Sequence, residues 1–331
     1  MNVIEDLMVM SSEQPLRSVV RDEHLLLSPP HPLNVPIKLA QEPPPLSVVH
    51  YPQEFQALAY APPRGVYEND ELRVEWQELN GRQPFYHRNA DVDEISYQIA
   101  GDRTLMTELG VLEHRPGEFS RIPRGVAHDN YSRAESHLLF YIPAPVAELV
   151  PAQRESQPVF PPFPGWQPAP ANEAVTWNLG APGRDIIIFG TDEQQLLDQV
   201  HSDDRRIPML RPGTDQGTTW LYGTDRIRIG LVTAGPGGER RYHRTVDADE
   251  IQYQAHGHRT LITQYGLVDL EPGDFVRLPL GIASASVVTE TGDYLRLLSR
   301  GALPQVAGTS RTADQYSPER LTTLLGAEVH S

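Results

Sequence analysis

The sequence predicts an all-β protein made of two tandem barrels. Short segments in which apolar and polar residues alternate recur at intervals of roughly ten residues, and turn signals such as NG, GD and RPG separate them. The pattern also repeats itself: the stretch from Tyr86 to His128 returns 156 positions later, as Tyr242 to Ser284, without a gap. A chain of 331 residues is long enough for two such units, each with its own core.

Residues 1–60 are rich in proline, and we expect an extended arm there. Proline neither continues a helix nor donates to a central β-ladder, so such a stretch favours a strap across the protein surface or a neighbouring subunit. The first barrel is expected over residues 61–145. Its alternating segments predict strands at 72–76, 94–100, 103–109, 118–123 and 137–143.

A second proline-rich stretch, residues 146–175, predicts a linker, and the second barrel is expected over residues 176–331. A short helix over 191–204 is expected, with Thr191 or Asp192 as N-cap. The remaining expected elements are strands at 184–190, 225–232, 250–257, 259–266, 274–279 and 294–299, and a closing helix over 318–325.

Composition excludes several classes of function. The chain carries 28 Lys and Arg against 44 Asp and Glu, a formal net charge of -16, so neither nucleic acid nor a membrane is expected as a partner. It has no cysteine, and a metal would therefore need His, carboxylate or amide ligands. Because the start does not look like a signal peptide and no run of about 18 apolar residues occurs, we expect a cytoplasmic protein.

Four side chains of metal-binding type, His87, Asn89, Glu94 and His128, stand in the pattern G-x5-H-x-N-x4-E-x6-G followed by G-x5-P-x-G-x2-H. Strand alternation points His87 and Asn89 to the same face. Glu94 has the wrong parity for a straight continuation. A turn at 90–93 is therefore expected to fold the chain back and to place Glu94 beside the pair.

A bend at 123–125 is expected to deliver His128 to the start of another strand, facing the interior. Two neutral imidazoles and one carboxylate leave a divalent cation with residual positive charge and open coordination positions, an arrangement associated with non-haem Fe(II) and O₂ chemistry. If the turn slid by one residue it would present Asp93 instead of Glu94, and both alternatives stay open at this point.

The spacing resembles both conserved motifs of the cupin superfamily, from Gly81 to His128 and again in the second copy, with Asn89 in place of the usual second histidine. The resemblance implies that each barrel is a double-stranded β-helix, or jelly-roll. The stretch from Tyr86 to Asn89 also looks like an iron-ligand segment of homogentisate 1,2-dioxygenases, which implies that His87, Glu94 and His128 hold iron. Hydroquinone-cleaving dioxygenases look similar and include an Asn ligand, which would fall on Asn89.

This chain departs from homogentisate dioxygenases in two ways: it is shorter, and its complete ligand set lies in the first copy of the motif instead of the second. In the second copy His243 and Glu250 remain, but Thr245 and Ser284 replace Asn89 and His128. We therefore expect a degenerate second barrel that is kept for packing against the first.

The leading hypothesis is an Fe(II)-dependent dioxygenase that cleaves a hydroxylated aromatic ring, such as hydroquinone, gentisate or homogentisate, with O₂. His87, Glu94 and His128 would be its metal ligands, and Asn89 either a weak ligand or a support for one. Gln98 and Asn130, which alternation points inward, are candidates for orienting bound oxygen. Arg121 and Tyr141 are candidates for holding an anionic or phenolic substrate.

Two alternative hypotheses are another metal-dependent cupin reaction (diketone cleavage, a lyase or an isomerase) and a non-catalytic bicupin that binds a small ligand. Mn, Ni, Cu and Zn remain alternatives to iron. A homodimer or higher homo-oligomer is expected, and a small partner subunit is compatible with the resemblance.

Overall fold

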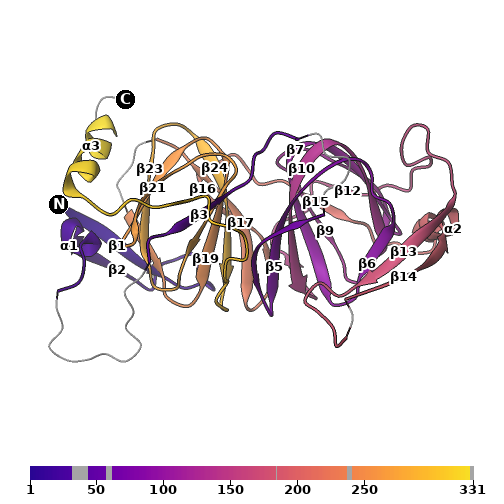
Figure 1. The fold of residues 1–331 in the computed structure, drawn as a ribbon, viewed down its shortest axis with the longest axis horizontal. Coiled ribbons are helices and arrows are strands. Elements are labelled where there is room, and N and C mark those ends of the chain that lie inside the picture. Colours follow the sequence, from indigo (N-terminus) through magenta and orange to yellow (C-terminus); the bar gives the residue numbers. More distant parts are fainter. Residues whose placement is uncertain (32–43, 57–61, 184, 237–240, 329–331) are drawn as a thin grey trace.

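The computed structural model describes the chain except for residues 32–43, 57–61, 184, 237–240 and 329–331. Two β-barrels lie side by side along the long axis of the molecule (Figure 1). The prediction of an all-β protein with two tandem barrels and a few short helices is confirmed, and each expected strand and helix overlaps an observed one. No helix in the described part of the chain combines the length and the apolar character needed to cross a membrane.

The first barrel is organised around two antiparallel strands of 16 residues each, β7 (Val92–Thr107) and β10 (His128–Pro143). Both are long enough to take part in the two faces of the barrel. Their neighbours are β4 (Arg64–Asn69), β5 (Leu72–Arg82), β6 (Tyr86–Asn89), β8 (Gly110–His114) and β9 (Phe119–Ile122).

The second barrel repeats this pairing with the long strands divided. Strands β19 and β20 take the place of β7, and β23 and β24 take the place of β10. The strands are β16 (Gly217–Gly223), β17 (Ile227–Ala234), β18 (Arg241–Thr245), β19 (Asp249–His256), β20 (Arg259–Thr263), β21 (Gly266–Leu270), β22 (Asp274–Leu278), β23 (Ala283–Val288) and β24 (Gly292–Ser299).

The two barrels exchange segments. The segment that precedes the first barrel in sequence pairs with the second barrel, and the segment that precedes the second barrel pairs with the first. Strand β1 (Asn2–Met8) pairs in parallel with β18, and β13 (Pro170–Thr176) pairs in parallel with β6. Both are followed by a hairpin partner, a short helix and a further short strand that pairs within the same barrel. These are β2 (Arg17–Asp22), α1 (Glu23–Leu27) and β3 (Ser47–His50) after β1, and β14 (Ile186–Asp192), α2 (Glu193–Asp198), the 3₁₀ turn Gln199–His201 and β15 (Pro208–Leu210) after β13.

The two expectations for proline-rich segments are corrected by this exchange. Residues 1–60 were expected to be an extended arm, but they contain a hairpin and a helical turn, because their first prolines lie outside residues 2–8 and 17–27. The expected linker 146–175 likewise supplies most of β13, together with β11 (Ala147–Glu148) and β12 (Arg154–Glu155).

Matching side chains hold the two exchanged segments. Arg244 of β18 donates to Glu5 of β1 at 2.6 Å, and Arg88 of β6 donates to Glu173 of β13 at 2.5 Å. Asp22 and Asp192 cap α1 and α2 by accepting the backbone N–H of the third residue on, as their N-cap chemistry predicts.

One apolar core is shared by the two barrels and is built from the faces of β7 and β10 opposite to Glu94, together with strands of the second barrel. It contains Trp76 and Tyr97 from the first barrel and Tyr222 and Tyr253 from the second. The C-terminal segment adds β25 (Arg311–Thr312) and α3 (Pro318–Glu328).

Candidate metal centre

The two predicted histidine ligands meet because β6 and β10 pair antiparallel at one point, which places His87 directly opposite His128. Their ring centroids are 3.9 Å apart. The bend before β10 contains Gly125, whose φ of 84° lies in the left-handed region that favours glycine. Its N–H donates to the carbonyl of Asn89 at 2.8 Å, which ties the bend to the end of β6.

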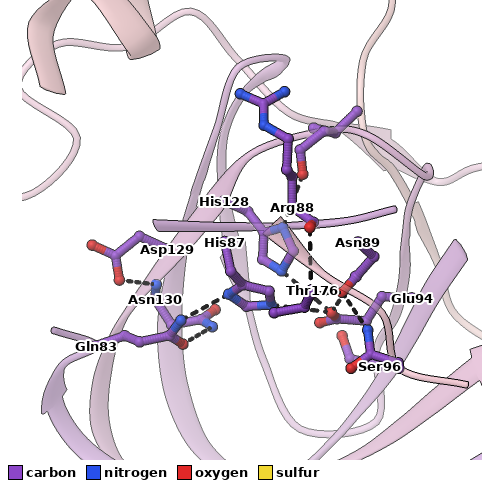
Figure 2. Close-up of polar contacts among 12 residues, drawn as sticks. Gln83, His87, Arg88, Asn89, Glu94, Ser96, His128, Asp129, Asn130 and Thr176 are labelled. Carbon is purple, nitrogen blue, oxygen red and sulfur yellow. Dashed lines mark hydrogen bonds and ion pairs between the residues drawn. The ribbon is translucent and has the colours of Figure 1, made fainter. Parts of the chain in front are cut away.

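Glu94 joins the histidines from the neighbouring strand, β7. Its Oε2 lies 3.4 Å from Nε2 of His87 and 3.3 Å from Nε2 of His128 (Figure 2). The three ligand atoms lie within 4.8 Å of one another. Asp93, the alternative ligand, faces away and binds Arg121 and the backbone N–H groups of Arg124 and Val146.

The donor set fits a divalent cation. Nδ1 of the fully buried His128 lies 3.1 Å from the carbonyl of Val126, an arrangement that places the proton on Nδ1 and leaves a lone pair on Nε2. That Nε2 is buried without a hydrogen-bond partner among the described residues. Burial alone would raise the pKa of Glu94, but the imidazoles of His128 and His87 lower this pKa well below its usual range, so the carboxylate is ionised. Burial, followed by His128, lowers the pKa of His87.

Asn89 supports this carboxylate instead of adding a ligand oxygen. Its Nδ2 donates to Oε2 of Glu94 at 2.9 Å, while its Oδ1 accepts from Thr176 and Asn178 at 3.0 and 2.5 Å. An NH₂ group has no lone pair for a cation, so of the two roles expected for Asn89, weak ligand or support for a ligand, these bonds favour the second. Thr176 ends β13 of the exchanged segment and Asn178 follows it, and the local motif could not have indicated either residue.

Gln83 is a further contact of the centre that the sequence interpretation missed. Its Nε2 lies 2.8 Å from Nδ1 of His87, and its Oε1 accepts a hydrogen bond from Nδ2 of Asn130 at 3.3 Å (Figure 2). Asn130 therefore reaches the centre only through Gln83. In Figure 2 it lies beside Gln83, on the side of His87 opposite to Glu94.

The remaining predicted site residues, Tyr141, Gln98 and Arg121, have different surroundings. Tyr141 is paired in register with Glu94, so the two side chains leave the sheet on the same face. Gln98 donates to Glu135 at 3.0 Å and to the turn at Gly101, deeper in the barrel. Arg121, a predicted substrate ligand, is instead held by Asp93 and Glu148 outside the centre.

The first barrel also contains a cluster of buried polar side chains that the linear motif did not indicate. Arg103 donates to Ser96 at 2.6 Å, and Nδ1 of His137 lies 2.8 Å from Glu135. Nε of Arg103 and both ring nitrogens of His114 are buried without a partner in the described part of the chain. Strand alternation alone placed Ser96 inward, but only the pairing of β7 with β8 and β10 brings the others to it.

The second barrel repeats the frame of this centre but keeps only part of its ligand set, His243 and Glu250. Ser284 stands opposite His243, where His128 stands opposite His87 in the first barrel. Arg296 pairs in register with Gln252, and the equivalent pair in the first barrel is Leu139 with Ser96. The guanidinium of Arg296 donates to Oε2 of Glu250 at 2.8 Å. A cation is therefore already placed on the carboxylate, and the expectation of a degenerate metal motif agrees with this geometry.

No family model and no curated protein matches the chain. Among solved structures, it is similar to a cupin 2 conserved barrel domain protein from Leptotrichia buccalis, with 10% identity, a TM-score of 0.45, and coverage of 74% of this chain and 92% of that chain. A mutant of Bacillus subtilis oxalate decarboxylase OxdC gives 16% identity, a TM-score of 0.47 and 82% coverage of both chains. Protein Ylba from E. coli shows 9% identity and a TM-score of 0.44, with coverage of 78% of this chain and 93% of that chain. These are distant likenesses and imply nothing about reaction or substrate.

Proposed function

We propose that this chain is a metal-dependent bicupin enzyme, and more narrowly an Fe(II)-dependent dioxygenase that opens the ring of a hydroxylated aromatic. One observation carries the proposal: His87, Glu94 and His128 converge in the first barrel with an unpartnered buried nitrogen among them. Iron held by two imidazoles and one carboxylate would supply a Lewis-acidic, redox-active centre with positions left for substrate and O₂.

The surrounding side chains have separable roles in this proposal. Asn89 holds the Glu94 carboxylate in place, and Val126 and Gln83 orient the two imidazoles. Such contacts keep a ligand set in a single geometry and tune its basicity.

The substrate class is supported by a buried donor near the centre that lacks an acceptor among the described residues. Arg103 is buried, and its Nε has no acceptor among the described residues, so an anionic oxygen would satisfy it. Tyr141 stands beside Glu94 on the same face of the sheet. A phenolate or a ring carboxylate suits this combination of a buried cation and an aromatic wall.

The test compares two equivalent histidines, one in each barrel. Metal content of the purified chain is measured beside His87→Ala and His243→Ala, followed by anaerobic Fe(II) loading and O₂ uptake with hydroquinone, gentisate and homogentisate. We expect iron and uptake to be lost in His87→Ala and retained in His243→Ala. Bound metal with no uptake on any of the phenols would favour another metal-dependent reaction, and metal retained in His87→Ala would refute the site itself.

A further inference from the structure

The second barrel contains a cavity of about 620 Å³ around the position where the first barrel gathers its ligands. This volume suits a small organic molecule. Its wall includes His243, Glu250 and Ser284, and also Trp220, Tyr294 and Arg296, which have no part in a metal motif. The cavity is therefore a site of its own, with chemistry different from that of the first barrel.

Positive charge exceeds negative charge at the base of this cavity. Arg296 is paired with Glu250, the carboxylate that is left over from the motif. Arg259 is buried just behind the wall, and its donors reach only neutral side chains in the described part of the chain: Gln252, Gln254 and Ser286. Among the described residues, the guanidinium groups of Arg296 and Arg259 therefore stand near the carboxylate of Glu250, and the lining also includes one further pair of opposite charges, Glu13 and Arg241.

The donors at this base are not all satisfied. Nε of Arg296 is buried and has no acceptor among the described residues, although a second N–H of the same guanidinium reaches Glu250. A buried charged N–H without an acceptor is costly unless a ligand supplies one. An anionic oxygen in the cavity would accept this hydrogen bond, whereas a metal ion would be repelled by the positive charge of the guanidinium.

The walls beside Arg296 are aromatic. Cζ of Arg296 lies 5.6 Å from the ring centre of Trp220, and Cζ of Arg259 lies 3.9 Å from that of Tyr294. Both rings line the cavity. They offer flat apolar surfaces next to the cationic base, which suits a ligand with a planar body and one anionic end.

The N-terminal segment supplies one side of the cavity. Met8, Met10 and Gln14 lie in its wall, and the N–H of Met10 donates to Asp247 at 2.8 Å. The site is thus completed by the exchange of β1 described above. The N-terminal segment therefore forms part of the wall of this site.

We propose that the second barrel binds a small organic carboxylate with a flat apolar body, its carboxylate at Arg296 and its body against Trp220. This site is independent of the reaction proposed for the first barrel. It accounts for the retention of a large polar cavity in a barrel that has lost two of its metal-binding side chains.

The test is a calorimetric titration of the full chain with benzoate and with its neutral analogue benzamide, after chelation and dialysis so that no metal mediates binding. We expect benzoate binding that is weakened in the second-barrel variants below, and binding weaker by about tenfold or more for benzamide, the loss typical of a charge-assisted hydrogen bond. Arg296→Gln and Trp220→Leu should each weaken benzoate binding, with thermal unfolding recorded for both.

Equal affinity for benzoate and benzamide would overturn the proposal. So would unchanged benzoate binding in the two folded variants, or no binding of benzoate, phenylacetate or formate up to about 10 mM, at the weak end of measurable affinity. Arg296→Gln leaves Glu250 without its cation and so carries a risk of misfolding. If it does not fold, Trp220→Leu and the benzoate–benzamide comparison decide the question, because neither alters the buried charges.

Discussion

Asn89 donates a hydrogen bond to Glu94 across 2.9 Å, and this contact joins the exchanged segment to the candidate metal centre. The amide is itself held through Oδ1 by Thr176 and Asn178, which lie at the end of β13 and just after it. The orientation of a ligand in the first barrel therefore depends on residues that follow the barrel in sequence.

Asn89→Ala should weaken metal binding by about 10–100-fold, the usual cost of removing a group that orients a ligand. Glu94 would lose its fixed donor and would turn away from the two imidazoles. Competition with a calibrated chelator measures the affinity, and Thr245→Ala, at the equivalent position of the second barrel, is the matched control. Equal losses in the two variants would contradict the role given to Asn89.

Restoring the missing ligand in the second barrel should require two changes. Ser284→His supplies the lost imidazole, but Arg296 still lies on Glu250, so Ser284→His alone is expected to bind no additional metal. Adding Arg296→Leu, which copies Leu139 of the first barrel, should raise the metal content by one ion per chain. Elemental analysis of the two variants distinguishes these outcomes, and extra metal in the single variant would show that Arg296 is not the obstacle.

The stability of the chain should fall below pH 6.5 in part because of His114. Burial holds the pKa of this histidine well below its ordinary value of 6.5, and both ring nitrogens lack partners in the described part of the chain. Between the lowered pKa and 6.5 the unfolded chain binds a proton that the folded chain does not, so the free energy of unfolding decreases as pH falls. One such group contributes at most about 1.4 kcal/mol per pH unit.

His114→Leu should therefore flatten the loss of stability between pH 7 and pH 5, measured by urea unfolding at each pH. The control is His258→Leu, because the His258 side chain is 65% exposed and lies on the other barrel. An unchanged slope in His114→Leu would mean that this histidine is protonated in the folded protein.

The exchanged N-terminal segment should contribute strongly to the stability of the whole molecule. Leu27 of α1 is buried in a cluster with Tyr242 and Ile262, so Leu27→Ala is expected to lower the free energy of unfolding by about 2–5 kcal/mol. Leu25→Ala, at an exposed position of the same helix, should change it by less than about 0.5 kcal/mol. Because the two barrels share one core, a single unfolding transition is expected in both variants. Two separate transitions in calorimetry would show that the barrels unfold independently.

Much of the first barrel could be predicted from local pattern. Alternation placed His87 and His128 on the interior face, and turn residues such as Gly125 marked where the chain reverses. The choice between Asp93 and Glu94 could not be made in this way, because it depends on which of them meets Arg121 from the adjacent strand. The role of Asn89, weak ligand or support for one, could not be decided locally for the same reason, since its partners lie 87 and 89 positions away.

The sequence by itself determined the strands, the duplication and the two histidines of the candidate centre, because side-chain direction in a strand follows from parity and a reversal follows from its turn residues. Tertiary structure alone decided which segment completes which barrel and placed Arg296 on Glu250. It also assembled the cavity of the second barrel from that barrel and the distant N-terminal segment. The reason is physical: strand pairing joins backbone groups that every residue carries, so the choice of partner is made by burial and charge across the whole molecule, which no local pattern records.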